Sequence, residues 1–159
     1  MANLGNFSLI LALLVSLYGA GATFFAGRKP KELSRLSKSG QRSLIASFGL
    51  ISLAALCLLG LLATRDLRVE YVASHVSRDL PLLYTLTAFW AGQAGSLLLW
   101  SWMVALTGLI GLLTLQRFFG LSIQVRLYTY HGILSVLSFF LALVIFVTSP
   151  FGLLPFTPA

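Results

Sequence analysis

Four long apolar runs, separated by short stretches that hold the charged side chains, dominate the pattern of this chain. The runs cover about residues 4–27, 43–64, 90–116 and 127–148. At a rise of about 1.5 Å per residue, a helix over each run is long enough to cross the roughly 30 Å hydrocarbon core of a bilayer. The runs lack the alternation of apolar and polar residues that a membrane β-barrel needs. The pattern therefore predicts an all-α fold, an integral membrane bundle of about four transmembrane helices in a single domain.

The composition agrees with this prediction and excludes an ordinary soluble domain. Of the 159 residues, 58% are hydrophobic and only 9% are charged, whereas about a quarter of the residues of a soluble domain are charged. The formal net charge of +7 would suit a nucleic-acid partner if it were spread over a soluble surface. The positive charge is instead concentrated between apolar runs. We therefore predict that membrane lipid surrounds the chain and that it has no nucleic-acid partner.

The distribution of basic residues predicts the orientation of the bundle. Loop 28–42 carries six of the eleven Lys and Arg residues, and loop 117–126 carries two with no acidic residue. Positive loops stay on the cytoplasmic side. In loop 65–81 the basic and acidic residues balance, and the tail 149–159 has no charge, so both face the other side together with the N-terminus. The basic residues of the first loop are Arg28, Lys29, Lys31, Arg35, Lys38 and Arg42.

A cleaved signal peptide is the alternative for the first run, because Ala20, Gly21 and Ala22 resemble a cleavage site. Such a peptide begins with basic residues, whereas here the positive charges follow the run. We therefore expect a retained first span.

Small residues recur within the spans at spacings that allow helices to approach closely in lipid. Their general abundance in membrane helices is the simpler explanation. The pairs and sets are Gly19 with Thr23, Ala22 with Ala26, and Gly132 with Ser135 and Ala142.

The third run holds the most distinctive side chains. The apolar stretch begins at Leu82 and is longer than one crossing requires. If it is helical, Trp90, Gln93 and Trp100 share one face, which could meet the outer membrane interface, a partner subunit or a flat apolar ligand. A belt of aromatic residues at headgroup level is the simpler interpretation. The opposite face consists of small residues that should pack against a helix: Ala88, Gly92, Gly95 and Ser96.

Few side chains in this chain suit catalysis or metal binding. The spans hold no acidic residue, which disfavours proton-coupled transport. His75 and His131 are predicted on opposite sides of the membrane, so they cannot form one haem site within a monomer. We expect a solvated loop histidine at position 75, a hydrogen-bonded interfacial histidine at position 131, and a core residue in the lone Cys57. No catalytic residue and no metal ligand is predicted.

Several short sequence blocks, spread over most of the chain, carry a resemblance to a known family. Gly95–Trp100 (Gly-Ser-Leu-Leu-Leu-Trp) is the most specific of them, and the others are Leu4–Phe7, Tyr71–Ser74, Leu80–Pro81 with Tyr84, and Thr148–Phe151. In their order and spacing the blocks resemble the CcmF-type membrane haem lyase family, whose members mature c-type cytochromes. The sequence departs from the family at Ala94, where an acidic residue is usual, and at His75, where Asn is common.

The resemblance implies a protein of the bacterial inner membrane, with both termini in the periplasm, that receives haem from a periplasmic haem chaperone. Haem would be the substrate of the assembled lyase, which joins it to the two cysteines of a Cys-x-x-Cys-His motif in apocytochrome c. The family's Trp-rich haem-handling motif and haem-ligating histidines lie beyond the matched region. The chain therefore resembles an N-terminal segment or a split subunit of such a lyase. Its expected partner in assembly is the remaining lyase segment or subunits.

Three functional hypotheses follow. In the first, the chain supports haem transfer and attachment, with Trp90, Gln93 and Trp100 as contacts for haem or apocytochrome. The second is a small transporter built by homo-oligomerisation. The third is a membrane anchor subunit of a quinone-linked respiratory complex.

Overall fold

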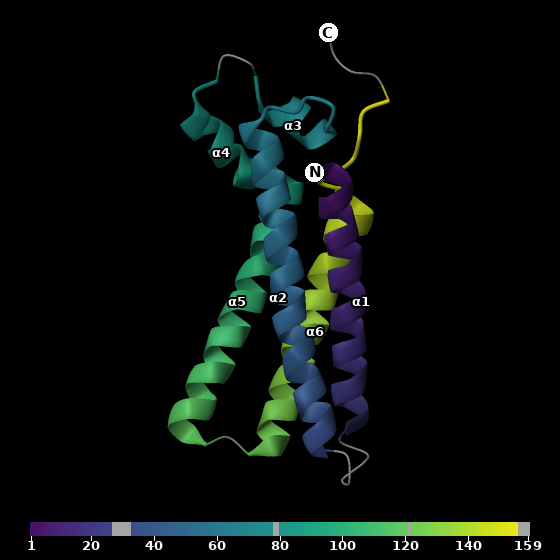
Figure 1. Cartoon of the computed structure of the whole chain (residues 1–159), viewed down its shortest axis with the longest axis vertical. Helices are drawn as coiled ribbons and strands as arrows, with labels where there is room; N and C mark the ends of the chain where they lie inside the picture. Colours follow the sequence, from purple (N-terminus) through teal and green to yellow (C-terminus); the bar gives the residue numbers. More distant parts are fainter. Residues whose placement is uncertain (27–32, 78–79, 121, 156–159) are drawn as a thin grey trace.

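The computed structural model describes residues 1–26, 33–77, 80–120 and 122–155. Its helices confirm the prediction of an all-α membrane bundle, because four of those described are long and apolar enough to cross a membrane (Figure 1). The last of them continues through a π-helical turn, η2 (Val144–Thr148). The four are α1 (Ala2–Ala26), α2 (Leu33–Ala63), α5 (Gln93–Phe119) and α6 (Ile123–Leu143).

Helix α1 packs along α2 and α6, while α5 lies against α2 and α6 (Figure 1). The short helices α3 (Glu70–His75) and α4 (Leu82–Ala91) lie at the end of the bundle that also holds the N-terminus. We call this end the α3 end. The opposite end, which holds the start of α2 and the connection between α5 and α6, is called the basic end.

Close packing of α1 rests on small residues. A Cβ atom on Gly19 would lie 2.5 Å from the Cβ of Ser43 and 2.8 Å from a methyl group of Leu134. The buried hydroxyl of Ser138 on α6 donates to Ser16 Oγ on α1 at 2.9 Å. Because apolar burial does not drive association of helices within lipid, close approach and such hydrogen bonds hold them together.

Gly132 on α6, by contrast with Gly19, does not mark a close approach of helices. Nothing lies within 4 Å of the position that a Cβ atom on Gly132 would occupy, so this glycine makes no close helix contact in the bundle. By contrast, Gly19 and Thr23 are both buried, as expected for helix packing. Cys57 is free and buried in the core, also as expected.

The third apolar run is not one helix, and the expectation of a continuous helical face from Trp90 to Trp100 is wrong. Helix α4 ends at Ala91, Gly92 is extended (φ −103°, ψ 164°), and α5 begins at Gln93. The break separates Trp90 on α4 from Gln93 and Trp100 on α5. Its physical cause is a side chain from outside the run, described with the site below.

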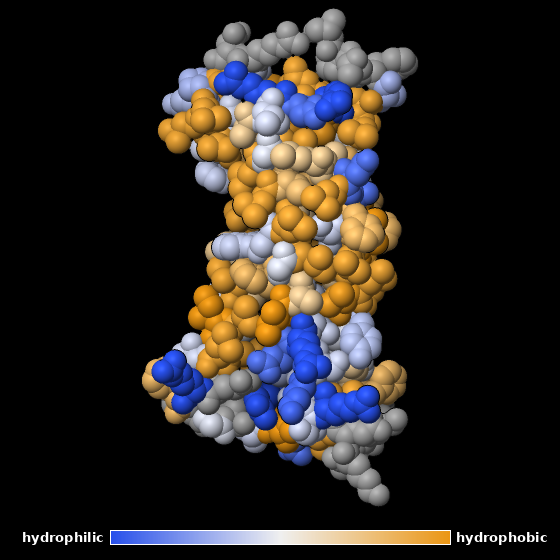
Figure 2. All heavy atoms as spheres, viewed as in Figure 1, coloured by the Kyte–Doolittle hydropathy of each residue, from blue (hydrophilic) through white to orange (hydrophobic). Residues whose placement is uncertain are grey.

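Helix α2 begins well before the apolar run that predicted it. Residues 33–42, which belong to the expected loop 28–42, form its first turns, and Arg35, Lys38 and Arg42 are exposed there. Arg117 near the end of α5 and Arg126 near the start of α6 lie at the same end of the bundle. On the face seen in Figure 2, hydrophilic side chains gather at both ends and hydrophobic side chains dominate between them.

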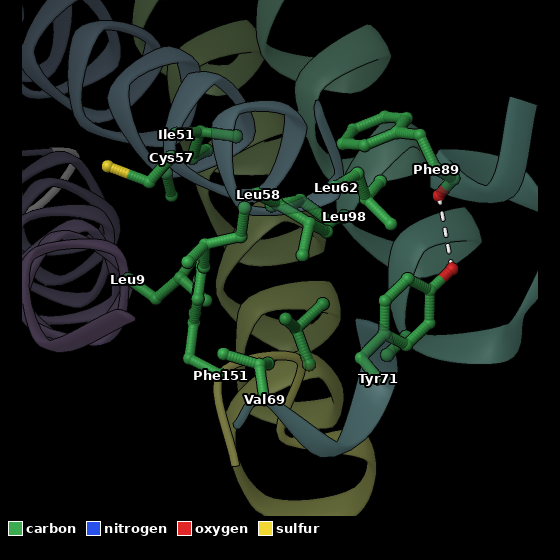
Figure 3. Packing of buried hydrophobic residues seen from close by; sticks show 14 of the residues in the cluster. Leu9, Ile51, Cys57, Leu58, Leu62, Val69, Tyr71, Phe89, Leu98 and Phe151 are labelled. Carbon is green, nitrogen blue, oxygen red and sulfur yellow. Dashed lines mark hydrogen bonds between the residues drawn. The ribbon is translucent and has the colours of Figure 1, made fainter. Parts of the chain in front are cut away.

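The segment between α2 and α4 folds together with the tail. Val69 forms an isolated antiparallel bridge with Leu153, and Glu70 N–H donates to the Gly152 carbonyl at 2.9 Å. Val69 has extended backbone (φ −88°, ψ 123°), and α3 begins at the next residue. Phe151 is buried, and its ring lies where a side chain on Gly5 would be. Through Val69 and Phe151 the core of the bundle continues into these connections (Figure 3).

Candidate functional site

The break between α4 and α5 is held by the hydroxyl of Tyr71, which lies on α3. Helix ends leave backbone groups without partners, and an apolar environment makes this costly. Tyr71 Oη donates to the Ala88 carbonyl at 2.9 Å and accepts from Gly92 N–H at 3.2 Å. Figure 3 shows the same hydroxyl pointing to the Phe89 carbonyl, 3.3 Å away. One buried side chain therefore hydrogen-bonds backbone groups at the end of α4 and just before the start of α5.

A second hydroxyl completes this arrangement. Ser96 Oγ on α5 donates to the Trp90 carbonyl at 2.8 Å, and Ser96 N–H donates to the Gly92 carbonyl at 3.0 Å. Ser96 therefore connects the last turn of α4 to the first turn of α5.

Two glycines make room for Tyr71 at the break. A Cβ atom on Gly95 would overlap the Phe89 carbonyl oxygen and the Tyr71 hydroxyl. One on Gly92 would overlap His75 Nε2 and the ring of Tyr71. Glycine at positions 92 and 95 is thus explained by the close approach of α3 and α4 to the start of α5. Gly95 is also the first residue of the most specific sequence block.

His75 is half-buried in the same cluster, so the expectation of a solvated loop histidine is wrong. Its ring stacks on Tyr71 with 4.5 Å between centroids. Nδ1 lies 2.9 Å from the Tyr71 carbonyl oxygen and 2.8 Å from Ser74 Oγ. Since a carbonyl oxygen can only accept, this contact places a proton on Nδ1. Nε2 lies against Gly92.

A polar pocket of about 260 Å³ opens beside this cluster. It is smaller than the roughly 300–1,000 Å³ of typical small-molecule sites, so it fits the head of a side chain better than a haem. Three elements form it: α3, the start of α5 and the segment around the end of η2. It is lined by Glu70, Tyr71, Ser74, His75, Gln93, Ala94, Val147, Thr148 and Ser149.

Of the three residues expected to contact haem or apocytochrome, only Gln93 lines this pocket. Trp90 and Trp100 are 55% and 57% exposed and lie outside its lining. The structure therefore leaves two exposed indoles near the α3 end without gathering the three side chains in one cavity. Their contact role stays a prediction. Trp102 has an internal role, because its indole N–H donates to Ser52 Oγ at 2.9 Å.

His131 lies toward the basic end, far from His75 in the fold. Its Nδ1 is 3.1 Å from the Ala20 carbonyl oxygen, and its ring lies 5.5 Å from that of Phe24. It is hydrogen-bonded, as expected. Within the described residues, no group of three His, Cys, Asp or Glu side chains could hold a metal ion.

Three ionisable groups at the α3 end, Asp66, Arg68 and Tyr71, have shifted pKa values. Burial raises the pKa of the Tyr71 phenol, and the backbone N–H groups of Gly92 and Gly95 oppose part of that rise. The Arg68 side chain, 2.8 Å from the carboxylate of Asp66, lowers the pKa of that carboxyl group. Tyr71 therefore remains a neutral hydrogen-bonding group well into the alkaline range.

Sequence reasoning gave no role to Tyr71, Glu70 or Ser149. The third apolar run is longer than one membrane crossing requires and contains Gly92 and Gly95. These two features could have indicated a helix break that needs a polar partner such as Tyr71. Glu70 and Ser149 carry no such signal, because they meet only when the tail folds onto α3.

The comparisons with known proteins define the class of this fold. The structure matches a solved structure described as "Cytochrome c Heme Lyase CcmF" with a TM-score of 0.84 and 28% sequence identity. The match covers 94% of this chain and 24% of that one. The bundle therefore has the fold of a segment of a CcmF-type membrane protein.

Curated relatives agree with that class. The cytochrome c-type biogenesis protein CcmF of Haemophilus influenzae is 34% identical over 152 residues, covering 95% of this chain and 22% of the relative. The cytochrome c-type biogenesis protein ccl1 of Rhodobacter capsulatus is 31% identical over 150 residues, covering 92% of this chain and 22% of the relative. No family model matches the chain.

The resemblance found in the sequence is thus confirmed, and this chain corresponds to a segment of a CcmF-type protein. It spans about a fifth of the length of these curated relatives.

Proposed function

We propose that the chain forms a scaffolding part of a membrane haem lyase, which supports the transfer of haem and its covalent attachment to apocytochrome c. The observation that carries this proposal is the match of nearly the whole bundle to a haem lyase structure, at a TM-score of 0.84. Haem is the substrate of the assembled lyase, and the remaining lyase segment or subunits supply the catalytic groups. No specific observation favours the transporter or the quinone-linked anchor.

The charge distribution supports an orientation in the bacterial inner membrane. Arg35, Lys38, Arg42, Arg117 and Arg126 all belong to the basic end. Positive charge next to transmembrane helices is retained in the cytoplasm. The α3 end, with both termini, would then face the periplasm, where it can meet the haem chaperone and apocytochrome c.

The exposed indoles of Trp90 and Trp100 support a contact surface at the α3 end. Large aromatic side chains supply much of the binding energy at protein interfaces, and they also stack on flat aromatic ligands. Together with Gln93, they are the residues through which we propose that this part of the lyase touches haem or apocytochrome. The small volume of the neighbouring pocket supports a role in positioning partners rather than in enclosing haem.

The test is co-expression with the remaining lyase segment, using Trp90→Ala and Trp100→Ala alone and together. We expect co-purification to persist and haem attachment to a reporter apocytochrome, measured by covalent haem staining, to fall. Tyr128→Ala is the matched control, because Tyr128 is 73% exposed but lies near the start of α6 at the basic end. Unchanged staining with unchanged assembly would refute the contact role, and failure of the unmodified chain to co-purify would refute the scaffold.

A further inference from the structure

The polar pocket at the α3 end offers hydrogen-bond acceptors, because the hydroxyl protons on its walls are already used. Ser74 Oγ donates to the Tyr71 carbonyl at 3.0 Å. Thr148 Oγ1 donates to the Val144 carbonyl at 3.1 Å, and Ser149 Oγ donates to the Ile145 carbonyl at 2.9 Å. Each hydroxyl oxygen keeps at least one lone pair for an incoming group, although Ser74 Oγ also lies 2.8 Å from His75 Nδ1.

The two aromatic side chains in the lining add no free donor. The Nδ1–H of His75 is directed at the Tyr71 carbonyl, and its Nε2 lies against Gly92. The Tyr71 hydroxyl donates into the helix break. Gln93 makes no side-chain hydrogen bond that is recorded within the described residues, and its amide can turn its oxygen inward. The pocket therefore accepts hydrogen bonds from several directions.

The pocket also carries a negative charge. Glu70 is the acidic residue in its lining, and the only ion pair recorded among the described residues joins Asp66 to Arg68. A carboxylate beside several acceptors repels anions and attracts a cation that can donate several hydrogen bonds. Ala94 and Val147 provide an apolar wall for the methylene groups of a long side chain.

From these observations we infer that the pocket binds the guanidinium group of an arginine presented by a partner protein segment at the α3 end. A guanidinium is a planar cation with five N–H donors and no acceptor, and this matches acceptors on several walls better than an ammonium does. The volume of about 260 Å³ admits a side-chain head. The inference concerns the chemistry of the pocket and stands independently of the lyase role.

The test uses the full chain in nanodiscs of zwitterionic lipid, with methyl-labelled alanine and valine followed by NMR. The probe is N-acetyl-arginine amide at millimolar concentration. We expect saturable shifts of the Ala94 and Val147 methyl signals, while the signal of Ala12, buried between helices, stays unchanged. N-acetyl-citrulline amide, which is neutral and of nearly the same shape, should bind at least about fivefold more weakly, because charge-assisted hydrogen bonds are lost.

Two variants test the negative charge. Glu70→Gln keeps the size of the side chain and should weaken arginine amide binding by about fivefold or more. Asp66→Asn removes a charge from the same connection, outside the pocket lining, and should leave binding unchanged. An unchanged Ala12 signal shows that each variant is folded. The proposal is overturned if the citrulline probe binds equally, if Glu70→Gln has no effect, or if N-acetyl-lysine amide binds more tightly than the arginine probe.

Discussion

At the scale of single residues, the hydroxyl of Tyr71 links α3 to the break between α4 and α5. It satisfies carbonyl and N–H groups on both sides of a helix break from a position 21 residues earlier in the chain. Burial fixes it in place, and the stacked ring of His75 covers it. A buried polar network of this kind has little tolerance for the loss of one member.

Tyr71→Phe removes this hydroxyl while the aromatic ring stays. We expect the variant to be less stable by about 1–3 kcal/mol, because the Ala88 carbonyl and Gly92 N–H lose their buried partner. Thermal unfolding in detergent, followed by circular dichroism, measures the loss. Tyr84→Phe is the control, since Tyr84 is 62% exposed at the same end and its change should have little effect. Equal stability of the two variants would contradict this account.

The raised pKa of Tyr71 predicts a dependence of stability on alkaline pH. The folded state holds the neutral phenol, whereas in the unfolded state the phenol has its ordinary pKa of 10.0. The stabilisation is therefore fully present below about pH 10 and is lost as the pH rises through the higher folded value. Melting temperatures measured from about pH 8 to 11 should decline more steeply for the unmodified chain than for Tyr71→Phe. Parallel curves would show that Tyr71 does not cause the decline.

At the scale of elements, the sequence predicted most helices well and missed what happens at their ends. Apolar runs 4–27 and 127–148 each correspond closely to a helix, because lipid demands continuous backbone pairing. The first turns of α2 were assigned to a loop because their charged residues lie outside the apolar run from which the helix was predicted. The excess length of the third run and its two glycines are compatible with a break, but they do not place it at Gly92. Tyr71, which lies outside the run, supplies the hydrogen-bond partners that make a break tolerable there.

Gly95→Ala tests the close approach at this break. The added methyl group would overlap a backbone oxygen and the Tyr71 hydroxyl, so α4 and α5 must separate, and we expect a loss of about 1–3 kcal/mol. Gly111→Ala on the same helix is the matched control, since nothing lies within 4 Å of its added atom. Alanine favours a helix over glycine by up to about 1 kcal/mol, so the control should be neutral or more stable. The difference in unfolding midpoint between the two variants is the measurement.

At the scale of the whole molecule, the sequence blocks that resemble the lyase family converge on the α3 end. Phe151 of the last block lies against Gly5 of the first, and Tyr71 lies against Gly92 and Gly95 near the third span. These contacts join segments distant in the sequence, so no local pattern predicts them. The candidate pocket escaped prediction for the same reason: Glu70, Gln93 and Ser149 come together only in the folded bundle.

The orientation of the bundle can be tested with two single cysteines in a Cys57→Ala background. Ser34 on the first turns of α2 and Ser77 after α3 are both exposed serines at opposite ends of the bundle. With the basic end in the cytoplasm, a membrane-impermeant maleimide added to intact spheroplasts should label Ser77→Cys and spare Ser34→Cys. Permeabilised cells should show labelling of both, which establishes that each site is reactive. Replacing serine by cysteine leaves the charge of both ends unchanged. The reverse labelling pattern would therefore mean that the charge asymmetry does not set the orientation. The α3 end would then lie in the cytoplasm, away from the periplasm in which we place its partners.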